Sequence, residues 1–175
     1  MTQKATLAGG CFWCLEAAYQ QVKGVHTVTN GYVGGSVPNP TYEQVCGGST
    51  GHAEAVQIEF NPNMVSFGEL LDIFWAIHDP TTRNRQGNDI GSQYRSVIFY
   101  HNHEQKASAS ASIRKAASLW KDPITTELLP LTEFYPAEEY HRDYFARHPE
   151  EAYCRVVINP KLQKLKHQFA SKLKI

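Results

Sequence analysis

Two cysteines, Cys11 and Cys14, lie three positions apart in LAGGCFWCLEAAYQQV, residues 7–22. This C-x-x-C spacing occurs both in zinc sites and in redox-active dithiols. Cys11 also follows an expected strand at residues 5–8 and a Gly-Gly turn, and it opens an expected helix. Free amide groups and the helix dipole at such a position stabilise a thiolate. The local pattern therefore predicts a reactive, ionised Cys11, and an inert buried thiol is an equally simple interpretation of it.

The remaining thiols, Cys46 and Cys154, are isolated in the sequence. Tetrahedral zinc requires two further ligands, usually a second close pair, so we expect no metal site. A dithiol fits the spacing better, although helical geometry predicts that Cys14 points away from Cys11 by roughly three-quarters of a turn or more. His52 and His78 are candidate bases for a Cys-His hydrolase, but neither lies in a recognisable local signature.

Glu54 is the most informative acid. In EAVQIEF it shares the strand phase of Val56, Ile58 and Phe60, so its side chain should point toward the apolar face. A carboxylate there is costly unless it is paired or protonated, and burial raises its pKa. A protonated carboxyl group can donate a proton to a leaving oxygen. The alternative is a glutamate at a strand end that still reaches solvent.

Aromatic and polar side chains near these groups complete the list of candidates. Phe12 and Trp13 are core residues by type, but beside a reactive cysteine they can form an apolar wall for a methyl group on sulfur. Tyr42, Asp89 and Tyr94 lie in or beside two long polar segments, residues 36–51 and 79–93, and can orient a polar group by hydrogen bonding.

The elements that must position these residues alternate irregularly along the chain. Alternating or apolar runs predict strands, and 3.6-residue periodicity predicts helices, with Ser66 and Glu69 at the spacing of a capping box. We expect an α+β fold on a single core. The expected strands are residues 5–8, 25–32, 54–60, 94–100, 125–131 and 153–158, and the expected helices begin near residues 11, 66, 102, 137 and 160.

The composition of the 175-residue chain is that of one ordinary globular domain, residues 1–175. Seventeen basic and seventeen acidic residues cancel, which disfavours nucleic acid and anionic membranes as partners. The sequence has no apolar run that approaches the ~20 residues of a membrane span and no secretory signal pattern. We expect a cytoplasmic protein and a monomer. In a reducing compartment we expect its four cysteines to be catalytic or buried thiols rather than members of disulfides.

Four long motifs resemble the peptide methionine sulfoxide reductase A family, in the same order and with similar spacing. They are GGCFWCLEA, YEQVCGGSTGHAEAVQIEF, HDPTTRNRQGNDIGSQYRSVIFY and AEEYHRDYFARHPEEAYC. The resemblance implies a ferredoxin-like two-layer α+β core with a mixed sheet, extra helices and long functional loops. It also implies reduction of methionine S-sulfoxide, free or within oxidised proteins, without metal or organic cofactor and with thioredoxin as reductant.

By the same resemblance, Cys11 is the nucleophile and Glu54 the acid that binds the sulfoxide oxygen. Phe12 and Trp13 match the pair that holds the sulfoxide methyl group, and the residues that match the oxygen pocket are Tyr42, Asp89 and Tyr94. Cys11 would become a sulfenic acid, which a second thiol resolves to a disulfide.

The resolving thiol is the least certain match. Cys154 occupies the family's tyrosine-cysteine position, but EEA replaces the glycine that often precedes it, and no glycine-rich tail follows. We expect Cys154 to resolve, with Cys46 as the alternative and direct reduction of the sulfenic acid as the third possibility. Two rivals of other classes are a zinc-stabilised binding module and a thioredoxin-like disulfide exchanger that needs Cys14.

Overall fold

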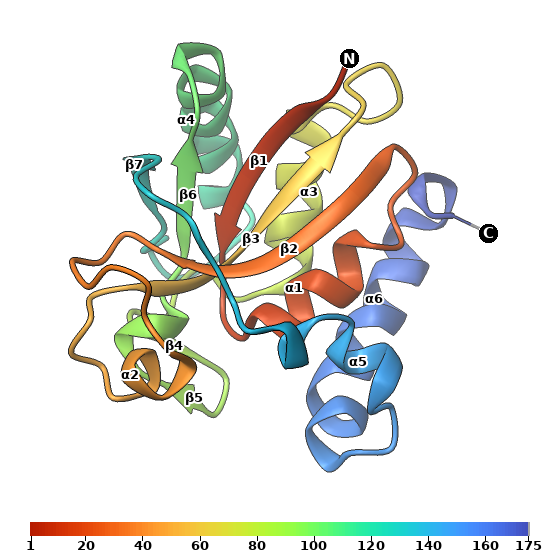
Figure 1. The fold of residues 1–175 in the computed structure, drawn as a ribbon. Helices are drawn as coiled ribbons and strands as arrows, with labels where there is room; N and C mark the ends of the chain where they lie inside the picture. The colour runs from red at the N-terminus through yellow and green to blue at the C-terminus, as the bar shows by residue number, and fades with distance from the viewer. Residues whose placement is uncertain (175) are drawn as a thin grey trace.

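The computed structural model describes residues 1–174 and contains one mixed six-stranded sheet (Figure 1). Neighbouring strands are antiparallel, except for the outer pair β7–β6, which is parallel. The strands follow one another across the sheet as β7 (Glu127–Pro130), β6 (Val97–Tyr100), β1 (Gln3–Ala8), β3 (Ala53–Phe60), β2 (Val25–Val33) and β8 (Tyr135–Pro136). With its helices, this sheet confirms the predicted α+β class.

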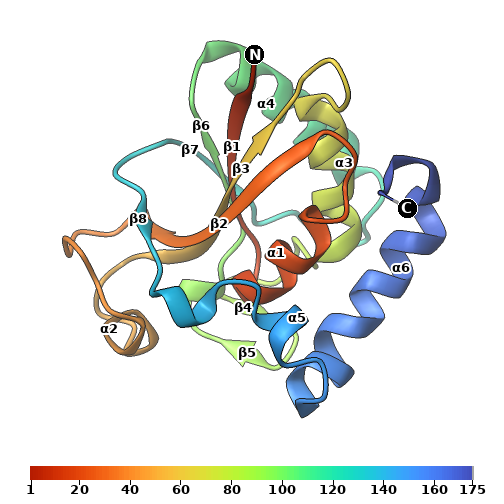
Figure 2. The same ribbon diagram turned by 45° about the vertical axis from the view of Figure 1, so that its right-hand side comes forward.

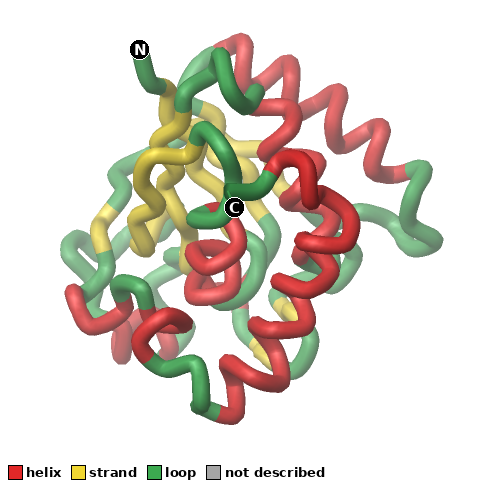
Figure 3. The backbone as a smooth tube through the Cα atoms, turned by 90° about the vertical axis from the view of Figure 1, so that its right-hand side faces the viewer, coloured by secondary structure: helices red, strands yellow, loops and turns green. Residues whose placement is uncertain are grey.

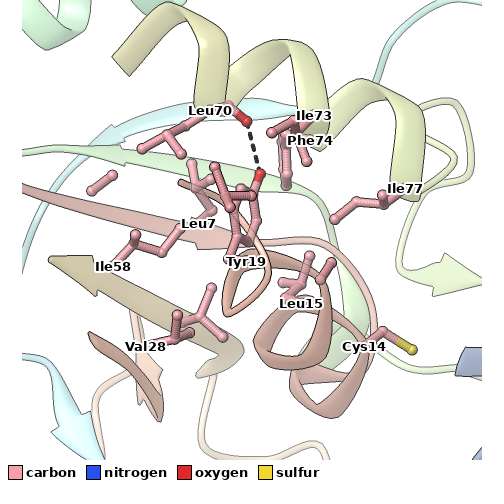
Figure 4. Packing of buried hydrophobic residues seen from close by; sticks show 14 of the residues in the cluster. Leu7, Cys14, Leu15, Tyr19, Val28, Ile58, Leu70, Ile73, Phe74 and Ile77 are labelled. Carbon is pink, nitrogen blue, oxygen red and sulfur yellow. Dashed lines mark hydrogen bonds between the residues drawn. The ribbon is translucent and has the colours of Figure 1, made fainter. Parts of the chain in front are cut away.

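Helices cover one face of the sheet, so that strands and helices form separate layers (Figure 3). The layer contains α1 (Phe12–Tyr19), α3 (Phe67–Ile77), α4 (His103–Ala117) and α6 (Asn159–Phe169). The predicted capping box of Ser66 and Glu69 opens α3. Its apolar stripe packs against α1, where the Tyr19 hydroxyl donates a 2.8 Å hydrogen bond to the Leu70 carbonyl (Figure 4). This packing anchors α1, and with it the C-x-x-C segment.

A smaller apolar cluster occupies the other face of the sheet. It contains Ala8, Val33, Ala53, Ala55, Val97 and Phe99, with Leu129, Leu131 and Phe134 packed on it. The small side chains allow the segment after β7 to lie close to the strands. A Cβ at Gly31 would come within 2.3 Å of the Phe134 ring, so this crossing requires glycine.

The two polar segments contain short elements that the periodicity did not predict. Residues 36–51 include α2 (Tyr42–Cys46), which opens with a capping box at Thr41. Residues 79–93 include the two-stranded ribbon β4 (Arg85–Gln86) and β5 (Asp89–Ile90), followed by the turn η1 (Ser92–Tyr94). The strand expected at residues 94–100 therefore begins only at Val97.

The C-terminal part differs most from the sequence-based expectation. The helix predicted from residue 137 is broken into η2 (Glu139–His141) and α5 (Tyr144–Arg147), because Asp143 between them adopts a left-handed backbone with φ of 53°. The predicted strand at residues 153–158 is wrong. These residues form the π-helical turn η3 (Cys154–Ile158), which continues directly into α6.

The burial pattern of this segment explains the error. Cys154 and Ile158 are buried, whereas Val156 is 70% exposed, so the apolar period is helical rather than alternating. The buried positions continue into α6 at Leu162 and Leu165. After α6 the chain closes with η4 (Ala170–Lys172). Among residues 1–174, no helix has the length and apolar character that crossing a membrane requires.

Candidate active site

Cys11 lies at the junction of β1 and α1, where it is the N-cap residue of the helix. Gly10 makes the turn with φ of +90°, and a Cβ there would come within 2.7 Å of the Gln86 side chain. Both observations explain why glycine precedes the cysteine. Cys11 is 5% exposed, so its thiol is close to the surface but largely withdrawn from water.

The surroundings of Cys11 do not favour the ionised resting state that the sequence predicted. Burial is the main cause that raises the pKa of this thiol well above its usual value, and Cys14 and Glu54 raise it further. The backbone N–H of Trp13 lowers it, which is the expected helix-terminus effect, but that contribution is smaller than desolvation. Cys11 is therefore a neutral thiol before substrate arrives.

Glu54 is buried, as its strand phase predicted, and it lies near Cys11. The antiparallel register of β1 and β3 pairs Leu7 with Val56, so Glu54, two residues before Val56, lies at the end of β1 from which the chain enters α1. One carboxyl oxygen, Oε1, accepts a 3.2 Å hydrogen bond from the Phe12 N–H. The other, Oε2, is buried and has no hydrogen-bond partner among the described residues.

Burial is the main cause that raises the pKa of Glu54 to about 8, and the charge of Asp89 adds to the shift. At neutral pH the carboxyl group is therefore mostly protonated. A neutral, unpartnered carboxyl oxygen beside a cysteine can donate a proton to an oxygen atom that departs from a bound molecule.

The two aromatic residues after Cys11 differ in accessibility. Phe12 is fully buried against Tyr32 and His141, whereas Trp13 is only partly buried. The Trp13 indole stacks flat on Tyr144, with ring centroids 3.7 Å apart. Trp13 is thus the accessible wall of the site, and Phe12 supports it from the core.

The oxygen-pocket candidates come from three separate elements. Tyr42 begins α2, Asp89 lies in β5 and Tyr94 ends η1, and all three are partly buried. Burial first, then the charge of Glu54, raises the pKa of both tyrosine hydroxyls, so both remain protonated donors. Figure 2 shows α2, β4 and β5 at the end of the molecule where α1 begins.

Sequence reasoning missed three residues that hold the site together. Glu138 accepts 2.8 Å hydrogen bonds from the Tyr32 hydroxyl and the Tyr42 N–H. His141 Nδ1 accepts a 3.0 Å bond from the Trp13 indole N–H. Tyr153 donates a 2.6 Å bond to Asp89. All three lie within the motif AEEYHRDYFARHPEEAYC, where the density of aromatic and acidic residues was the available signal.

The two candidate histidine bases serve other contacts. His78 is buried between the Phe74 carbonyl and the Ser96 hydroxyl, and burial lowers its pKa to about 4. His52 Nδ1 accepts a hydrogen bond from the Gly35 N–H, and its Nε2 is hydrogen-bonded to the Val37 carbonyl. No group of three or more metal-ligating side chains occurs within residues 1–174, and the expectation of a metal-free site stays a prediction.

The three other cysteines differ in their relation to Cys11. Cys154 is fully buried in η3, and Cys46 is exposed at the end of α2, where it interacts with the Tyr42 hydroxyl. Cys14, predicted to point away, is the third residue of α1 after the N-cap Cys11, and the two thiols shift each other's pKa.

A profile described as peptide methionine sulfoxide reductase matches residues 3–173 of the chain. The chain belongs to the peptide methionine sulfoxide reductase family. Among its relatives in this family is the peptide methionine sulfoxide reductase MsrA of Thermus thermophilus, which is 59% identical over 170 residues and 97% of each chain.

Solved structures of peptide methionine sulfoxide reductases share the fold. Reduced Mxr1 from Saccharomyces cerevisiae superposes with a TM-score of 0.80 at 36% identity, over 87% of this chain and 89% of that one. Mxr1 in complex with Trx2 superposes with a TM-score of 0.57 at 25% identity, over 82% and 84%. As a member of this family, the chain is an enzyme that reduces methionine sulfoxide.

Proposed function

We propose that this protein uses Cys11 and Glu54 to reduce the S epimer of methionine sulfoxide, free or within oxidised proteins. The observation that carries this assignment is the buried, unpartnered Oε2 of Glu54 beside the neutral Cys11 thiol. A buried polar atom without a partner is costly, and a sulfoxide oxygen that accepts its proton removes this cost.

The reaction balances without an external proton. The Cys11 sulfur attacks the sulfoxide sulfur, and Glu54 donates its proton to the oxygen while the thiol proton replaces it. The hydroxyl group then moves from the methionine sulfur to the Cys11 sulfur while the sulfur–sulfur bond breaks, so that methionine leaves and Cys11 becomes a sulfenic acid. Sulfur in methionine gains two electrons, and the Cys11 sulfur loses them.

Side chains around the two reacting groups set the orientation of the substrate. Trp13, backed by Phe12, offers an aromatic surface to the substrate methyl group. Tyr42 and Tyr94 offer protonated hydroxyls to the sulfoxide oxygen. The Asp89 carboxylate acts through Tyr153, which it holds by hydrogen bonding.

Regeneration requires an external dithiol, for which we propose thioredoxin. The yeast relative has been solved in complex with Trx2, which supports this partner. Nucleic acid and membrane are not proposed as partners, and the cytoplasmic location, the monomeric state and the absence of a cofactor stay predictions from the sequence. Cys154 or Cys46 as resolving thiol likewise stays a prediction.

We assign the core to the ferredoxin-like class within a single domain of residues 1–175. The strand order β6-β1-β3-β2, entirely antiparallel, supports this assignment, with α1 between β1 and β2 and α3 between β3 and β6. The strands β7 and β8 extend the sheet at its two edges.

The test is a turnover assay on purified protein with the separated S and R epimers of a methionine sulfoxide peptide, thioredoxin, thioredoxin reductase and NADPH. We expect methionine from the S epimer and none from the R epimer, with Cys11→Ser inactive. Equal consumption of both epimers, or turnover by Cys11→Ser, would overturn the proposal.

A further inference from the structure

Cys14 is the thiol nearest to Cys11 along the chain, its backbone is hydrogen-bonded to that of Cys11, and the proposed function does not use it. The Cys14 N–H donates a 3.1 Å hydrogen bond to the Cys11 carbonyl. Such a bond closes a four-residue turn, whose end Cα atoms lie within about 7 Å. Disulfides span Cα separations of roughly 4.4–6.8 Å, so the backbone already has the geometry for a Cys11–Cys14 bond.

The side chain of Cys14 is part of the buried apolar cluster, but its sulfur also has polar neighbours. Figure 4 shows the sulfur directed away from the labelled apolar side chains of the cluster. It lies 4.0 Å from the Tyr153 hydroxyl, which itself donates to Asp89. The Cys11 thiol is close enough to shift the pKa of Cys14. The Cys14 sulfur therefore lies where the apolar core meets the site.

These neighbours favour a thiolate at Cys14. The Cys11 thiol is the main cause that lowers the pKa of Cys14 to about 7, against the opposing effect of burial, and Lys161 and Tyr153 contribute in the same direction. The attacking species in disulfide formation is the thiolate. When Cys11 is oxidised, its thiol no longer contributes, and Lys161 and Tyr153 remain as the groups that favour a Cys14 thiolate.

We propose that Cys14 is the first resolving thiol of this enzyme, an inference that rests on the proposed sulfoxide reduction. The Cys14 sulfur attacks the sulfenic sulfur of Cys11, an S–S bond forms and the S–O bond breaks. The leaving hydroxide takes the proton that Cys14 gave up and departs as water. A thioredoxin dithiol then reduces the Cys11–Cys14 disulfide by exchange and is itself oxidised to a disulfide.

The two other cysteines are less suited to this first step. Cys154 is fully buried in a π-helical turn, and it must leave that packing to reach another sulfur. Cys46 lies on α2, where burial raises its pKa. Either residue can still receive the disulfide from Cys14 in a later exchange, which would not change the first step.

The experiment uses reduced protein mixed with a slight excess of methionine sulfoxide peptide in the absence of any reductant. Trypsin cleavage after Lys4 and Lys23 gives one peptide that contains both Cys11 and Cys14. After free thiols are alkylated, we expect this peptide to appear unalkylated and lighter by two hydrogen atoms at the earliest times. We expect the same result in the double variant Cys46→Ser/Cys154→Ser, which keeps only the proposed pair.

The matched variant is Cys14→Ser. We expect it to form one methionine per enzyme, to accumulate a Cys11 sulfenic acid that dimedone labels, and to lose roughly tenfold or more of its thioredoxin-driven turnover. A first disulfide from Cys11 to Cys46 or Cys154, or a persistent sulfenic acid in the double variant, would overturn the role of Cys14. If the wild-type protein forms no methionine, the proposed sulfoxide reduction itself fails.

Discussion

The site has two halves that are held in different ways. Cys11 follows β1 as the N-cap of α1, and Glu54 lies in β3, so the pairing of β1 with β3 brings the two segments together through the backbone. Tyr153 and His141 come from the C-terminal segment, where hydrogen bonds to Asp89 and Trp13 and contacts between aromatic rings hold them against the first half. The sheet therefore positions the proposed reacting groups, whereas the C-terminal segment positions the side chains around them.

The largest expected loss of activity comes from a change in the half of the site that contains Cys11 and Glu54. Cys11→Ser removes the only sulfur next to Glu54 that the proposed reaction uses, so we expect complete loss of methionine formation. A turnover assay measures the loss, and thermal unfolding shows whether the variant keeps its fold. Methionine formation by a folded Cys11→Ser protein would shift the chemistry to Cys14 and break the comparison.

Glu54→Gln should reduce kcat by roughly 10²–10⁴-fold, because the amide keeps the oxygen that accepts the Phe12 N–H but has no carboxyl proton to give. We expect KM to change little, since the side chain keeps its size. Steady-state kinetics measure both constants. An unchanged kcat would contradict the role of Glu54 as acid.

The pH dependence of kcat should report the titration of Glu54. Because burial raises the pKa of Glu54 to about 8, the protonated form prevails below pH 8, and kcat should fall as pH rises above it. For stability, the folded pKa exceeds the unfolded value near 4.5, so this contribution is complete below pH 4.5 and is lost as pH rises through 8. Both trends should be weaker in Glu54→Gln.

Tyr153→Phe tests the C-terminal half. It removes one hydrogen bond to the Asp89 carboxylate and one polar neighbour of the Cys14 sulfur, while the ring remains packed at the site. We expect roughly a tenfold loss of kcat/KM, the size of one charge-assisted hydrogen bond of about 1.4 kcal/mol. The pKa of Cys14 should also rise above about 7, which the pH dependence of its alkylation measures.

The smallest effect should come from His141, which we consider a positioning residue. His141→Leu leaves the Trp13 indole N–H without its acceptor, and we expect KM to rise a few-fold with kcat nearly unchanged, since one neutral hydrogen bond contributes about 1 kcal/mol. His141→Asn offers an oxygen near the position of Nδ1 and should restore KM. Equal KM in both variants would show that Trp13 is held by its stack on Tyr144 alone.

The sequence by itself determined the strands of the central sheet, the capped start of α3 and the inward phase of Glu54, because each follows from local periodicity or a cap at short spacing. The motifs also identified the family correctly, and the role of Cys11 stays a prediction. These features depend on residues close in the chain, which a linear pattern records.

Only the tertiary structure decided the protonation of Cys11, the orientation of Cys14 and the helical turn at Cys154. Desolvation by the surrounding core outweighs the helix terminus at Cys11, and that burial comes from segments far apart in the chain. Likewise, Tyr153 is hydrogen-bonded to Asp89, 64 residues away in the sequence, and local periodicity cannot predict such a contact. The proposed reacting pair could therefore be predicted from the sequence, but the electrostatic state of Cys11 and Cys14 could not.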